Sequence, residues 1–95
     1  MTGNSSDLSK LIWRSAPGVS FEPRDHGAVL TIKDTSAVHF LNATAAVVFL
    51  LCDGANTSAM IADEVAKQFG LAETPNQDVG VALSELRDKG LILTC

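Results

Sequence analysis

The sequence predicts one α+β domain of the winged helix-turn-helix type, with a three-stranded antiparallel sheet followed by three helices. Three observations carry this prediction. Short β-prone segments separated by tight turns come first, a run of almost purely apolar residues follows, and two amphipathic helical patterns complete the chain. Ninety-five residues are enough for a single hydrophobic core.

Residues 1–12 are expected to form a flexible N-terminal tail ahead of a domain that spans residues 13–95. Met1–Lys10 is rich in small polar residues and lacks the apolar segment of a signal peptide, so we expect a cytoplasmic protein. Leu11, Ile12 and Trp13 either dock on the domain or begin a first strand.

Three segments are expected to pair as an antiparallel meander. Val19–Glu22 is the first strand, limited by Pro23 and followed by a hairpin turn over residues 24–27. Ala28–Lys33 is β-branched and apolar and is the clearest strand, and Ala37–Leu41 returns after a turn at residues 34–36. A sheet this small needs a helix against one face.

The expected cover is the helix that follows, because nine of the ten residues from Ala43 to Cys52 are apolar. Asn42 suits the N-cap, and Gly54 suits the left-handed residue that ends many helices. Such a helix is apolar on nearly every side and should be buried all round, and it is too short to cross a membrane.

Two amphipathic helices should follow. Thr57 is an N-cap candidate for the first, Gly70 ends it, and Ile61, Val65 and Phe69 form its apolar stripe. After a loop at residues 71–76, the second helix runs from Asn76 to Lys89. Its apolar positions are Val79, Ala82, Leu83 and Leu86. Leu91–Leu93 is then a short strand or a plug for the core.

Composition argues against several classes of function. The net charge of −4 disfavours nucleic acid and anionic membrane as partners. Two cysteines form no metal or disulfide pattern, and His26 and His39 are not spaced as a pair, so both histidines are expected to be structural. No phosphate-binding glycine loop occurs. We therefore expect no enzymatic activity, no metal and no cofactor.

The last helix contains two small residues, Gly80 and Ala82. If they face the strand at residues 37–41, they leave a shallow groove between strand and helix. If Gly80 does not face that strand, it is an exposed glycine that the helix tolerates, although glycine lowers helix stability by about 1 kcal/mol relative to alanine. A free edge on that strand would accept an extended peptide by β-augmentation.

The chain also resembles a known family at Leu41–Ala46 (LNATAA) and Leu51–Gly54 (LCDG), with weaker likeness at Asp78-Val79, Leu83, Leu86 and Gly90-Leu91. These residues are similar to the PqqD family, the peptide-recognition proteins of pyrroloquinoline quinone biosynthesis, and to their relatives, the RiPP recognition elements. The resemblance covers residues 19–93, and the general family pattern fits better than the quinone-pathway protein itself.

The resemblance implies a non-catalytic module that binds the leader of a ribosomally made precursor peptide and delivers it to a modifying enzyme, such as a radical SAM protein, a protease or a cyclase. It implies a site where the leader pairs with the third strand and lies against the third helix. Carried onto this chain, the site comprises Ala37, Val38, His39, Phe40, Asp78, Val81, Ala82 and Glu85. A monomer or weak homodimer is expected, and the leader should supply apolar side chains and basic ones for Asp78 and Glu85.

Two alternatives come from other classes of function. The two amphipathic helices with an apolar tail also suit an acidic winged-helix regulator that binds DNA or protein, although Asp78, Glu85 and Asp88 oppose phosphate on the last helix. A small dimerising scaffold, with apolar surface at an interface, is the other alternative.

Overall fold

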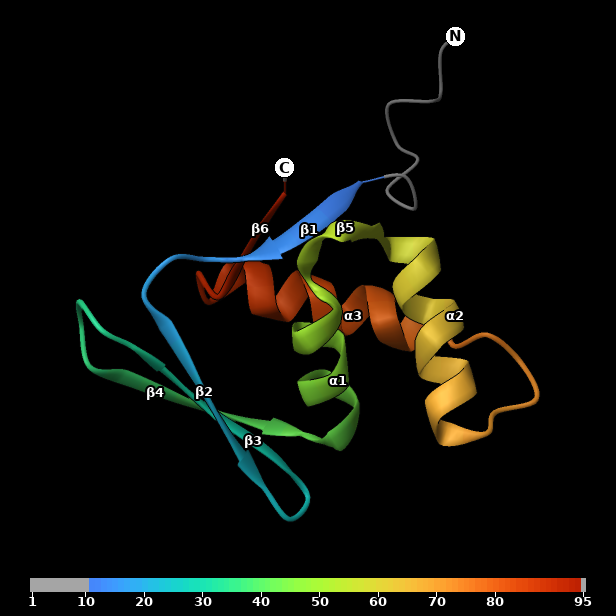
Figure 1. The fold of residues 1–95 in the computed structure, drawn as a ribbon, viewed down its shortest axis with the longest axis horizontal. Helices are drawn as coiled ribbons and strands as arrows, with labels where there is room; N and C mark the ends of the chain where they lie inside the picture. The colour runs from blue at the N-terminus through green and yellow to red at the C-terminus, as the bar shows by residue number, and fades with distance from the viewer. Residues whose placement is uncertain (1–10, 95) are drawn as a thin grey trace, which may run out of the picture.

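The computed structural model describes residues 11–94, which form two small antiparallel sheets and three helices (Figure 1). In chain order the elements are β1 (Ile12–Ser15), β2 (Val19–Arg24), β3 (Gly27–Ile32), β4 (Ala37–Asn42), α1 (Ala43–Leu51), β5 (Asp53–Thr57), α2 (Ser58–Phe69), α3 (Asn76–Asp88) and β6 (Ile92–Thr94). The predicted α+β class, with a three-stranded meander and then three helices, is confirmed. Residues 1–10 of the expected tail lie outside the described residues, and Ile12 already belongs to β1.

The predicted meander is the sheet β2-β3-β4, in which β3 is the central strand. Its first hairpin differs from the prediction, because β2 does not end at Pro23 but continues to Arg24, and the turn is only Asp25 and His26. Pro23 is tolerated because β2 lies at an edge of the sheet, where a strand residue does not need its N–H.

Gly27 is the first residue of β3 rather than part of the turn. A Cβ atom at this position would lie 1.8 Å from the carbonyl oxygen of Leu41 in β4. The start of β3 and the end of β4 therefore approach closely enough that only glycine fits between them.

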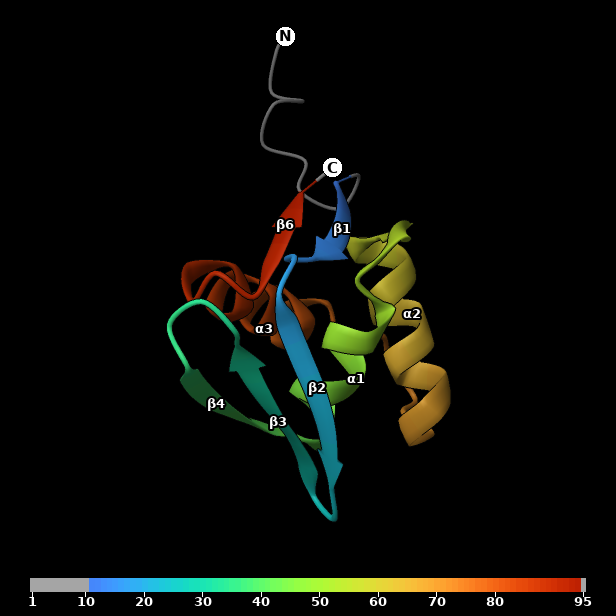
Figure 2. The same cartoon turned by 60° about the vertical axis from the view of Figure 1, so that its left-hand side comes forward.

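A second sheet, ordered β5-β1-β6, closes over the other end of the molecule (Figures 1 and 2). Strands at the positions of β1 and β6 were among the alternatives that the sequence allows, whereas β5 was not predicted. Gly54 was expected to end the preceding helix; instead it lies in β5 with φ of 86°, beside the register shift opposite Trp13 and Arg14. Gly54 thus lies at a β-bulge and does not end the helix.

The helix ends follow the predicted capping residues in most cases. Asn42 Oδ1 accepts a bond of 2.8 Å from the N–H of Ala45, and Thr57 Oγ1 accepts one of 3.2 Å from Met60. Gly70 ends α2 in the left-handed conformation, with φ of 64°. No helix among the described residues is long and apolar enough to cross a membrane.

Helix α1 packs against the β2-β3-β4 sheet and against α2 and α3, so it is the centre of the core. The Phe21 ring of β2 stacks on the Phe49 ring of α1 with centroids 5.8 Å apart. The expectation that α1 is buried all round is wrong, since Leu50 is 57% exposed on the side that no element covers. Phe69, expected in the apolar stripe of α2, is also exposed because it lies in the last turn of that helix.

We expect alanine substitutions at two glycines to have opposite effects on stability. Gly27→Ala should lower the free energy of unfolding by about 3 kcal/mol, because its methyl group overlaps the Leu41 carbonyl. Gly80→Ala in α3 should raise it by about 0.5–1 kcal/mol, because a Cβ there meets nothing within 4 Å and alanine favours the helix. Urea unfolding of both variants measures the two changes, and a stable Gly27→Ala protein would contradict the close approach of β3 and β4.

Candidate functional site

Strand β4 has an unpaired side. It is the last strand in the order β2-β3-β4, so its other side faces no strand among the described residues. In antiparallel sheets, residues alternately direct their N–H and C=O groups to one neighbour and then to the other. The Lys33 N–H donates to the Gly18 carbonyl oxygen at 2.9 Å, one pair beyond the end of the β2–β3 register. This bond identifies the residues of β3 that bond to β2, and the alternate residues of β3 therefore bond to β4. By that alternation, Val38 and Phe40 direct their backbone groups to the open side.

The side chains of the predicted strand residues divide between the two faces of the sheet. Val38 and Phe40 are 50% and 78% exposed, on the face away from α1. Ala37 and His39 are half-buried and lie on the other face, in register with Ile32 and Leu30 of β3. An extended segment beside β4 would therefore meet two exposed apolar side chains on one face and the helices on the other.

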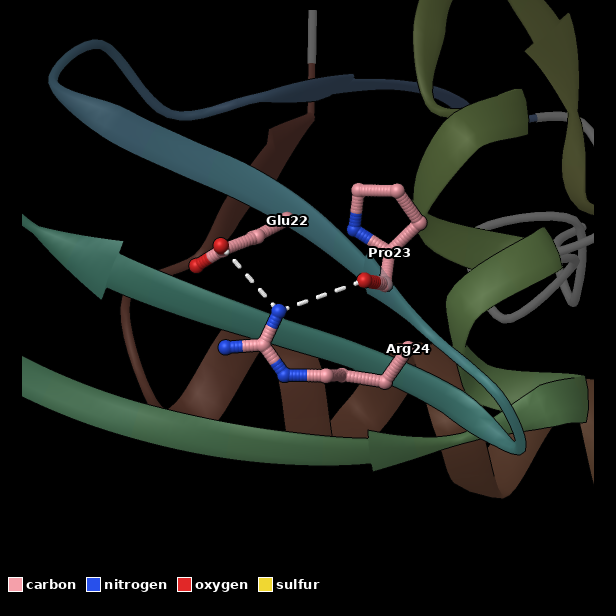
Figure 3. Close-up of polar contacts among 3 residues, drawn as sticks. All are labelled: Glu22, Pro23 and Arg24. Atoms are coloured by element: carbon pink, nitrogen blue, oxygen red, sulfur yellow. Dashed lines mark hydrogen bonds and ion pairs between the residues drawn. The ribbon is translucent and has the colours of Figure 1, made fainter.

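The opposite edge of the same sheet is protected. Pro23 supplies no N–H to the outer side of β2, and Arg24 Nη1 lies 3.1 Å from Glu22 Oε2 and 3.3 Å from the Pro23 carbonyl oxygen (Figure 3). Proline and charged side chains both hinder the addition of a strand. Strand β4 contains neither, so it is the edge of this sheet that is suited to accept one.

Helix α3 presents the four predicted helix residues to a single groove of about 330 Å³. These residues are Asp78, Val81, Ala82 and Glu85, which recur at helical spacing on one face. The facing wall is formed by Asn42 at the end of β4 and by Thr44 and Ala45 in the first turn of α1. The groove thus begins where the open edge ends, and residues 37–40 lie along the edge rather than in the groove.

The facing wall of the groove was not predicted from the sequence. The sequence predicts a helix cap at Asn42 and a buried helix at Thr44 and Ala45, and none of the three is among the predicted site residues. A signal was present, because Thr44 is the single polar residue among the ten from Ala43 to Cys52. A polar residue in the first turn of an apolar helix indicates that this end of the helix reaches the surface.

Gly80 does not help to shape this groove, so of the two alternatives that the sequence left open the exposed, tolerated glycine is the one observed. Residues two apart on a helix point about 200° apart. Gly80 instead lines a separate hollow of about 220 Å³ on the other side of α3. The other residues that line it are Trp13, Ser58, Ala59, Asn76, Val79, Leu83, Ser84 and Arg87. Ala82 is therefore the only one of the two small residues in the groove.

The groove is negatively charged. Asp78 and Glu85 are exposed, and neither forms an ion pair within the described part of the chain. No lysine, arginine or histidine lines the groove. His26 lies in the first hairpin turn and His39 in the middle of β4, so the structure does not bring the two histidines together. Within residues 11–94, no three side chains of the types His, Cys, Asp and Glu are grouped so as to hold a metal ion.

Comparison with known proteins gives one family and two solved structures. A sequence model of the family described as Coenzyme PQQ synthesis protein D (PqqD) matches residues 27–92, more than two thirds of the chain. The structure of TbiB1 in complex with the TbiA(beta) leader peptide has a TM-score of 0.70 at 20% identity, over 83% of this chain and 93% of that one. The structure of a lasso peptide synthetase B1 complexed with the leader peptide has a TM-score of 0.71 at 23% identity, over 86% and 98% of the two chains. No curated protein matches.

The one described thiol, Cys52, is only 2% exposed. Burial, reinforced by the nearby Asp53 carboxylate, raises the pKa of Cys52 from 9.0 to about 12. Its Sγ donates to the Val48 carbonyl oxygen at 3.2 Å. Because the thiolate is the nucleophilic form, this cysteine is unsuited to covalent catalysis and acts as a small core residue.

We expect Cys52 to be unreactive in the folded protein. In a Cys95→Ser variant at pH 8, an aromatic disulfide reagent should react about a thousandfold more slowly than with the urea-unfolded chain. The rise in the pKa of Cys52 from 9.0 to about 12 lowers the thiolate fraction, and burial restricts access to the sulfur. Absorbance of the released thiol measures the rate. Rapid labelling without denaturant would show that the core around α1 is open to solvent.

Proposed function

The chain belongs to the PqqD family, and from this premise we propose that it is a non-catalytic module that recognises the leader of a ribosomally synthesised precursor peptide by β-augmentation. The observation that carries the proposal is the unpaired edge of β4, which continues into the groove lined by α3. Two proteins of the same fold were solved with a leader peptide bound, which supports the same class of ligand here.

The proposed contacts follow from the geometry of the edge. The leader would pair with the outward backbone groups of Val38 and Phe40, so that main-chain hydrogen bonds supply affinity largely independent of sequence. Its side chains would alternate between the two faces of the sheet. One set would lie beside the exposed Val38 and Phe40 side chains, and the other set would face His39 and the α3 groove.

The chemistry on the precursor would belong to a separate enzyme, such as a radical SAM protein, a protease or a cyclase. This division of roles agrees with the two solved structures of the same fold, which are complexes with a leader peptide. Since the ligand is a ribosomal product, we place the encounter in the cytoplasm. A free protein that is a monomer or weak homodimer fits this role, because a second copy on β4 would compete with the leader.

Amide NMR tests the proposed site. The probe is the N-terminal half of a short peptide encoded beside this gene, titrated into the ¹⁵N-labelled protein. We expect the largest shifts along residues 37–41 and at Ala82 and Glu85, with slower amide exchange at Val38 and Phe40, because these N–H groups gain partners. Shifts confined to other elements would contradict the proposal. If protection at Val38 and Phe40 instead rises with protein concentration and without peptide, β4 pairs with a second copy.

Filling the groove should weaken binding of the same peptide. Ala82→Trp should raise the Kd about tenfold or more, because the indole occupies space that the peptide needs. Gly80→Trp is the matched control, since it adds the same ring to the same helix on the side away from the groove. Calorimetric titration measures both constants, and thermal unfolding verifies that both variants fold. Equal affinity for the two variants would show that the peptide does not enter the groove.

A further inference from the structure

The groove has the charge of a site for a cationic segment. Asp78 and Glu85 are seven residues apart on α3, which places them about 10.5 Å apart along the helix axis, with Val81 and Ala82 between them. The facing wall, Asn42, Thr44 and Ala45, is uncharged. A peptide in this groove would therefore meet two unpaired carboxylates that flank a short apolar floor.

The open edge restricts which peptide residues reach those carboxylates. Peptide residues that lie opposite Val38 and Phe40 direct their side chains to the outer face, and the intervening ones point to the inner face, where α1 packs against β3 and β4. A peptide that continues past the end of β4 into the groove would keep this alternation. Inward side chains therefore recur at every second position, about 6.6 Å apart, so that two inward positions four residues apart lie about 13 Å from each other. Where the peptide runs along α3 in the groove, flexible Lys or Arg side chains at two such positions would span the distance between the carboxylates, with an apolar side chain at the inward position between them.

We propose that the groove selects peptide segments of the pattern basic-x-apolar-x-basic, in which the basic residues pair with Asp78 and Glu85 and the apolar residue lies on Val81 and Ala82. This inference rests on the proposed function and adds the chemical class of the leader. The acidic wall also rejects acidic segments, because no cation in the groove offsets the two carboxylates.

Selection from a library tests the pattern separately from the site. The probe is a phage-displayed library of random 12-residue peptides, selected on the intact protein at low salt. We expect enrichment of Lys or Arg at alternate positions around an apolar residue. The same selection on an Asp78→Asn/Glu85→Gln double variant should lose the basic residues. A Glu64→Gln/Glu73→Gln variant removes the same charge outside the groove and should keep them.

Individual enriched peptides should bind the groove double variant more weakly, by about two- to fivefold for each neutralised carboxylate. Raising the salt concentration should weaken binding to the unaltered protein and have little effect on the double variant.

The outcomes separate the inference from the proposed function. Enriched peptides that shift the β4 amides but lack basic residues, or that bind the groove double variant unchanged, would overturn the charge pattern and leave β-augmentation standing. If no peptide is enriched, the pattern is overturned as well. If the precursor-derived peptide also leaves the β4 amides unshifted, the proposed function fails with it.

Discussion

The direct passage from β4 into α1 is the constraint on which the candidate site depends. Asn42 is both the last residue of β4 and the N-cap of α1, so no loop separates the open edge from the helix. Its Oδ1 bond to Ala45 fixes the first turn of α1, and the close approach of Gly27 to Leu41 fixes the end of β4. The edge and one wall of the groove therefore behave as one rigid unit, which lowers the entropy cost of receiving a strand.

The other wall of the groove is a face of α3, and the buried side of that helix determines which way this face points. Val79, Leu83 and Leu86 are almost fully buried, so the helical period turns the face of Asp78, Val81, Ala82 and Glu85 outward. Beyond α3 the chain enters the core again at Leu91 and Ile92, and β6 pairs with β1. The second sheet thus ties both ends of the described chain to the same core (Figure 2).

The sequence predicts those features that depend on the conformational and hydrogen-bonding preferences of single residues, such as the helix ends. Asn42, Thr57 and Gly70 stand at helix ends because their side-chain or backbone preferences suit those positions. Strand β5 was missed because Asp53–Thr57 has no apolar alternation, and its pairing is supplied by β1, some forty residues earlier in the chain. The groove was only partly predictable for the same reason. The helical period of α3 predicts that its four residues share one face, whereas the facing wall depends on how α1 packs in the folded protein. The position of Gly80 stayed open between the groove and an exposed site, because small size alone does not give a direction on the helix; it lies on the other side of α3.

The two edges of the β2-β3-β4 sheet differ in a way that stability alone does not explain. An unprotected edge strand with exposed apolar side chains is an aggregation hazard, and proteins usually blunt such edges with proline or charge. Strand β2 has both, in Pro23 and the Glu22–Arg24 pair (Figure 3). Strand β4 instead exposes Val38 and Phe40, the latter at 78%, beside outward backbone groups that have no strand to pair with in the described chain. Since the same sheet protects one edge, the open state of the other fits the proposed role of this edge in accepting a peptide strand.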